Sequence, residues 1–136
     1  SQPTDYGSFV TKIVTRMVRE SGAVDQDLLR RAIGLSSSYM VTDASTNTQS
    51  GIDSWKVGFI TAIDTVVALH HRGELELETV NEASKACSEC WSVAGTWRGM
   101  DACRSTVREV ASKLRRILDE PNHRTYRGEK VYAPAR

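Results

Sequence analysis

Cysteine residues are the side chains of this sequence that are best suited to chemistry. Two of the three lie in the stretch KACSECWSVAGTWRG, residues 85–99. Cys87 and Cys90 have the Cys-x-x-Cys spacing of a zinc-binding pair, and Cys103 with His123 would complete four ligands. Closed zinc sites place such a pair on a tight turn, and no helix-breaking residue separates the two here. We therefore predict no metal and no cofactor, and keep a zinc site as an alternative.

The residues around the cysteine pair favour a buried helix instead. A redox pair would need to lie at a helix N-terminus, which lowers a thiol pKa, with a strand leading into it, and neither feature is evident here. Small and apolar residues recur here at helical spacing, which predicts an inward-facing stripe. Free cysteine packs as a small apolar group in such stripes. The predicted stripe consists of Val80, Ala83, Cys87, Cys90, Trp91, Ala94 and Trp97.

A second set of residues could support catalysis. His70 and His71, if they converged with Asp64 and Cys87, would bring together a base, a carboxylate and a thiol. However, no glycine-rich phosphate loop, HExxH or GxSxG motif accompanies them. Two histidines at a helix end are also typical of a C-terminal cap. We predict a non-catalytic protein, with a small metal- or His/Asp-dependent enzyme as an alternative.

The elements that must position these residues are helices. Apolar residues recur at intervals of three and four over most of the chain, and Asp25 is a predicted N-cap. The segment 53–71 is apolar nearly all round, as in a central helix. Residues 42–51 predict a loop. Residues 73–78 alternate as a strand does, but no second strand lies nearby, so we predict a linker before a helix that starts at Thr79.

These elements predict an all-α, single-domain antiparallel bundle of four to five helices over residues 1–121. An extended basic and aromatic tail, residues 122–136, follows it. The 136-residue chain is 40% apolar and 26% charged, which is typical of a globular domain. No apolar run is long enough to span a membrane. The odd number of cysteines argues against a disulfide framework, so we expect a cytoplasmic or nuclear location.

The last helix and the tail suggest how the protein could bind a partner. Cys103, Val107, Val110, Leu114 and Ile117 step by four and three, which predicts a narrow apolar seam that could pair with a helix of the same or another chain. Symmetric self-association through this seam is a further hypothesis. We predict an adaptor or scaffold domain that binds a partner protein or helix through a groove, the last helix or the tail. The predicted contact residues are Arg115, Tyr126, Arg127, Val131 and Tyr132.

Nucleic-acid binding is the weaker alternative for the same region. From residue 104 to the end, the sequence contains nine Lys and Arg residues but only four Asp and Glu residues. Such a surface could contact phosphates, and the tail tyrosines could stack on bases. The formal net charge of the whole chain is only +1, so acidic residues in the remainder of the domain offset the positive charge of this region.

Overall fold

Helices dominate the computed structural model, which describes residues 5–21, 25–43, 49–96, 101–119, 123–126 and 129–132. Over these residues the helices are α1 (Tyr6–Ser21), α2 (Gln26–Gly34), α3 (Ser36–Asp43), α4 (Gln49–His71), α5 (Leu77–Thr96) and α6 (Asp101–Leu118). Leu35 alone separates α2 from α3, and its N–H still bonds to the Arg31 carbonyl at 3.2 Å. The two therefore act as one interrupted helix, and the predicted all-α bundle of four to five helices is confirmed.

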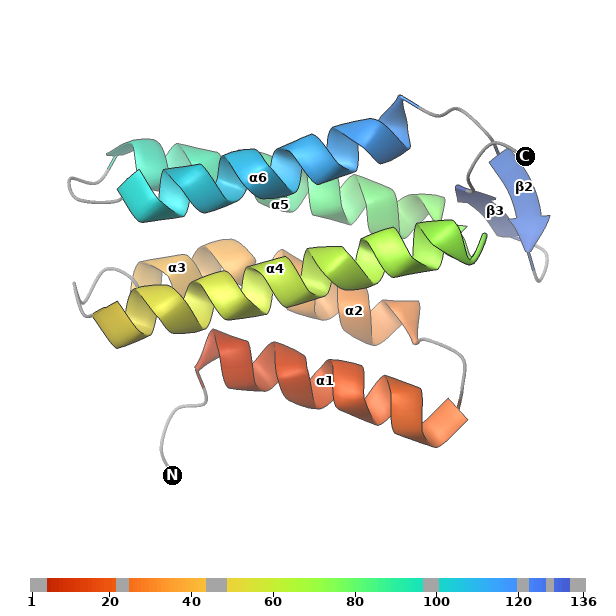
Figure 1. Ribbon diagram of the computed structural model, residues 1–136, viewed down its shortest axis with the longest axis horizontal. Helices are drawn as coiled ribbons and strands as arrows, with labels where there is room; N and C mark the ends of the chain where they lie inside the picture. The colour runs from red at the N-terminus through yellow and green to blue at the C-terminus, as the bar shows by residue number, and fades with distance from the viewer. Residues whose placement is uncertain are drawn as a thin grey trace.

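The bundle has two layers (Figure 1). Helices α1, α4 and α6 run in one direction, with α4 between the other two, and α2, α3 and α5 run in the opposite direction behind them. Because α4 contacts every other helix, it is the central helix that its apolar composition predicts. Its inward side chains Trp55, Phe59, Ala62, Ile63 and Val66 are fully buried. No helix in the described ranges combines the length and the apolar character needed to cross a bilayer.

One local signal in the sequence corresponds to an observed helix end, whereas the predicted bounds of a loop differ from the observed ones. The Asp25 carboxylate accepts hydrogen bonds from the backbone N–H groups of Asp27 and Leu28, so the predicted N-cap of α2 is confirmed. The predicted loop 42–51 is too long, because α3 extends to Asp43 and α4 begins at Gln49.

A small antiparallel sheet closes one end of the bundle (Figure 1). Its strands are β1 (Leu75–Glu76), β2 (His123–Tyr126) and β3 (Glu129–Tyr132), in the order β1-β3-β2. The prediction of a linker over 73–78 and a helix from Thr79 is wrong, since β1 is a strand and α5 starts at Leu77. The partner strand of β1 comes from the far end of the chain, where no local pattern could indicate the pairing.

Candidate functional site

The three cysteines lie in the core, as predicted. Cys90 and Cys103 are fully buried, Cys87 is 8% exposed, and all three are free thiols. Burial raises the pKa of Cys87 to about 11 and that of Cys90 to about 12. The Cys90 thiol also donates to the Ser36 hydroxyl at 3.4 Å. These thiols are therefore protonated at neutral pH, whereas a nucleophilic or redox-active cysteine requires a lowered pKa.

The described residues do not assemble the zinc site that the sequence left open. Among them, no group of three or more His, Cys, Asp or Glu side chains is placed to hold a metal ion. The fourth candidate ligand, the side chain of His123, lies outside what the structure describes, although the backbone of His123 pairs with Tyr132.

The buried thiols predict slow chemical labelling. At pH 8 we expect Cys87 of the folded protein to react with Ellman's reagent about a hundredfold, and Cys90 about a thousandfold, more slowly than in urea, because their thiolate fractions fall by about these factors. Stopped-flow absorbance would measure both rates. Since the folded pKa exceeds the ordinary value of 9.0, the fold should also lose stability as the pH rises from there toward 11. Labelling of the folded protein at the unfolded rate would contradict this assignment.

Trp91 departs from the predicted stripe. Its side chain is 41% exposed, whereas Val80, Ala83, Cys90 and Ala94 of the same helix are fully buried. The buried positions already form a complete seam at helical spacing, and Trp91, one residue after Cys90, is rotated away from it. The prediction that its indole fills the core is therefore wrong. Trp97, the other indole of the stripe, lies outside the described residues.

The exposed indole lies beside basic residues of α6. The Arg108 guanidinium carbon is 5.1 Å from the centre of the Trp91 ring, a cation–π arrangement. Arg115 is exposed two turns further along the same face of α6. On α5, the residues one turn before and after Trp91 are exposed and uncharged, Ser88 and Gly95. We call these five residues, Ser88, Trp91, Gly95, Arg108 and Arg115, the Trp91 surface.

The apolar seam of α6 is fully covered by other helices of the same chain. Cys103, Val107, Val110, Leu114 and Ile117 are all buried, and α6 packs on α4 and α5. The seam therefore pairs with helices of the same chain, which is one of the two predicted arrangements, and its side chains are not available to a second copy or a partner helix.

The predicted contact residues fall in different places. Arg115 is exposed on α6, whereas Tyr126 ends β2. Val131 and Tyr132 pair through their backbones with Glu76 and Leu75 of β1. Arg127 lies outside the described residues. The backbone of the tail therefore folds back on the bundle.

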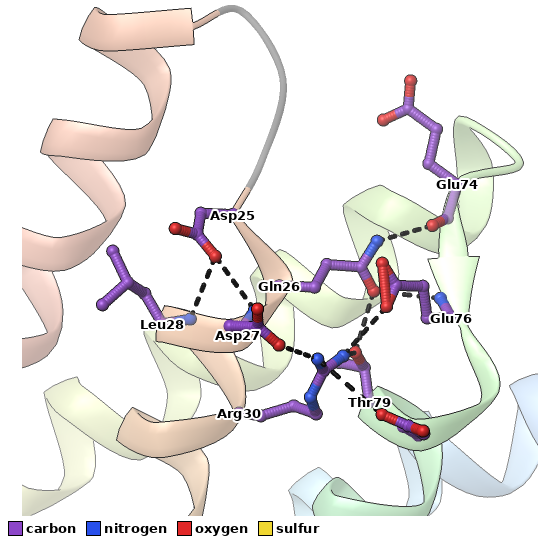
Figure 2. Close-up of polar contacts among 9 residues, drawn as sticks. Asp25, Gln26, Asp27, Leu28, Arg30, Glu74, Glu76 and Thr79 are labelled. Atoms are coloured by element: carbon purple, nitrogen blue, oxygen red, sulfur yellow. Dashed lines mark hydrogen bonds and ion pairs between the residues drawn. The ribbon is translucent and has the colours of Figure 1, made fainter. Parts of the chain in front are cut away.

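A polar cluster holds β1 in position to receive the tail (Figure 2). The Gln26 side-chain amide donates to the Glu74 carbonyl at 2.6 Å, and its oxygen accepts from the Glu76 N–H at 2.9 Å. These two backbone groups lie on one edge of β1, while Leu75 faces β3 on the other. Arg30 donates to the Glu76 carboxylate and to the Thr79 hydroxyl, both at 3.0 Å. The side chain of Gln26 thus closes the free edge of β1, as a neighbouring strand would.

Three of the four residues of the catalytic alternative line one pocket. Asp64, His70 and His71 lie along a pocket between α4 and α6, together with Lys113 and Arg116. Cys87, on α5, is not among its lining residues. The set that would unite a thiol with the imidazoles is therefore not assembled. The Asp64 carboxylate instead accepts from Lys113 at 2.8 Å, so it is a surface ion-pair partner.

Comparison with known proteins identifies no relative of this chain. The chain matches no protein-family model, and no curated protein and no solved structure shows significant similarity to it.

Proposed function

We propose that this chain is a non-catalytic protein-interaction domain that binds a partner segment through the Trp91 surface. The observation that carries the proposal is the 41% exposure of Trp91 beside a seam that is otherwise buried. Tryptophan and arginine are enriched among the residues that dominate binding energy at protein interfaces. A large indole left half exposed and held by Arg108 is a pre-positioned anchor of this kind.

The charges around Trp91 indicate the chemistry of the partner. Within the described residues, neither Arg108 nor Arg115 forms an ion pair, whereas Arg104 pairs with Asp101 and Lys113 with Asp64. Arg108 lies over the indole, and Arg115 follows two turns further along the same face of α6. We therefore propose a partner segment with one large apolar side chain and neighbouring carboxylates, which would complement both features.

The same ion pairs weaken the nucleic-acid alternative. Arg104 and Lys113 are engaged with carboxylates of this chain, so a phosphate backbone would have to displace those partners. Among the side chains that the structure describes, the other cations of α6 are Arg108 and Arg115, which form a short row on one face of the helix, and Arg116. A short acidic peptide fits this row better than a duplex does.

A selection from a displayed library of random short peptides tests the proposal with a defined probe. We expect the enriched peptides to combine Asp or Glu with a Leu, Phe or Trp side chain. Trp91→Ala and Arg108→Gln should each weaken the binding of a selected peptide by about tenfold or more, as measured by fluorescence polarisation. Val18→Ala is the matched control, since Val18 is an exposed apolar residue, at 69%, on the distant helix α1.

Two results would contradict the proposal. One is an enriched set without acidic residues, and the other is binding that is equally strong in the Trp91→Ala and Val18→Ala variants. Tyr126→Ala and Tyr132→Ala in the full chain test whether the tail is the binding site instead. If it is, these two variants should lose binding while Trp91→Ala retains it.

A further inference from the structure

A pocket of about 320 Å³ lies between the last two turns of α4 and of α6. Its volume falls within the range of small-molecule sites, which begins near about 300 Å³. Four of its seven lining residues, His70, His71, Lys113 and Arg116, carry side-chain nitrogen atoms. The lining residues are Asp64, Val67, His70 and His71 from α4, and Lys113, Arg116 and Ile117 from α6.

The side chains that line this pocket offer more hydrogen-bond donors than the protein itself satisfies with acceptors. Arg116 has no hydrogen bond or ion pair among the described residues, so its guanidinium donors are available to a ligand. The Lys113 ammonium donates to Asp64 at 2.8 Å, and the Glu109 carboxylate lies 4.0 Å away, beyond hydrogen-bond distance. Two of its three protons therefore remain for another acceptor. Asp64 thus fixes the position of the Lys113 ammonium and leaves it able to donate further hydrogen bonds.

The two histidines are not required to cap α4. Gly73 has a positive φ of 73°, its N–H bonds to the His70 carbonyl at 3.0 Å, and the Glu74 N–H bonds to the Leu69 carbonyl at 2.9 Å. This is a Schellman motif, in which the backbone itself satisfies the terminal carbonyls. The cap function that the sequence suggested for His70 and His71 is thus performed by the backbone. His70, at 4% exposed, forms part of the pocket wall, and the exposed His71 lies at its rim.

We infer that this pocket binds a small soluble phosphate monoester. Its oxyanion would lie between Arg116, Lys113 and His71, since guanidinium groups bind phosphate through paired hydrogen bonds. Its apolar part would pack on Val67 and Ile117, which supply the hydrocarbon surface of the pocket. Among the lining residues, Lys113 and Arg116 outnumber the carboxylate Asp64, and Glu109, 4.0 Å from the Lys113 ammonium, lies outside the lining. This site is separate from the Trp91 surface, because none of its lining residues belongs to that surface.

Calorimetric titration of the full chain with phenyl phosphate, and separately with inorganic phosphate, tests this inference at constant ionic strength in chloride. We expect saturable binding of both, with the phenyl ester tighter because its ring contacts Val67 and Ile117. Arg116→Gln should weaken binding by about tenfold or more, as loss of a charge-assisted pair does. Arg115→Gln is the matched control: it removes the same charge from the adjacent, exposed residue, which is not in the pocket lining.

Several outcomes would overturn the inference. These are the absence of saturable binding to the unaltered protein, an equal loss in the Arg116→Gln and Arg115→Gln variants, and phenyl phosphate binding no tighter than inorganic phosphate. Urea denaturation of each variant establishes that it remains folded. Co-sedimentation with vesicles that contain phosphatidic acid, if lost in Arg116→Gln, would assign the site to a lipid headgroup and contradict a soluble ligand.

Discussion

Replacing Trp55 with alanine is expected to lower the free energy of unfolding by about 3–5 kcal/mol. The indole is fully buried in α4, and its ring centre lies 5.3 Å from that of Phe59. Its Nε1–H donates to the Ser36 carbonyl at 2.9 Å, at the start of α3. Alanine would leave a cavity in the middle of the bundle and remove a donor from a buried carbonyl.

Trp91→Ala is the matched control for this effect. The Trp91 indole is partly in solvent, and its cation–π contact with Arg108 is worth about 0.5–1 kcal/mol. We therefore expect a much smaller loss, of about 1 kcal/mol. Urea denaturation followed by far-ultraviolet circular dichroism measures both variants without depending on tryptophan fluorescence. Equal losses in the two variants would contradict the assigned positions of the two indoles.

The helical architecture could be predicted because its signals are local. The repeat of Cys103, Val107, Val110, Leu114 and Ile117 identifies the buried face of α6, and all five side chains are buried. The N-cap at Asp25 is likewise encoded within a few residues. Such patterns do not say which partner covers an apolar face. For this reason, the seam of α6 could not be distinguished from a dimer interface before α4 and α5 were placed against it.

The features that sequence analysis missed depend on contacts between distant parts of the chain. β1 is a strand because Gln26 closes one of its edges and Tyr132 and Val131 pair with the other. Nothing between residues 73 and 78 encodes either contact. The pocket between α4 and α6 likewise exists only because the parallel course of these helices brings His71 near Arg116. Trp91 is the exception, since its offset from the spacing of Ala83, Cys90 and Ala94 was a local signal.

The close approach of α1 to α4 gives the second large effect. Within an isolated helix, Gly58→Ala would be stabilising by up to about 1 kcal/mol, because alanine has the higher helix propensity. In the bundle, a Cβ at this position would lie 2.9 Å from the Tyr6 carbonyl oxygen. That contact is with backbone, and Tyr6 itself is anchored by its hydroxyl, which donates to the Ala32 carbonyl at 2.6 Å. We expect α1 to be displaced, with a net loss of stability of about 1–3 kcal/mol.

Gly95→Ala supplies the control with the opposite expected sign. Gly95 is exposed in α5, and among the described residues no atom beyond its chain neighbours and the adjoining helix backbone lies within 4 Å of the position that a Cβ would occupy. Here the propensity gain of up to about 1 kcal/mol has nothing to oppose it. Urea denaturation should therefore shift to a lower midpoint for Gly58→Ala and to an equal or higher midpoint for Gly95→Ala. A stabilising Gly58→Ala would mean that α1 does not approach α4 this closely, and the position of Tyr6 between α2 and α4 would then have to be revised.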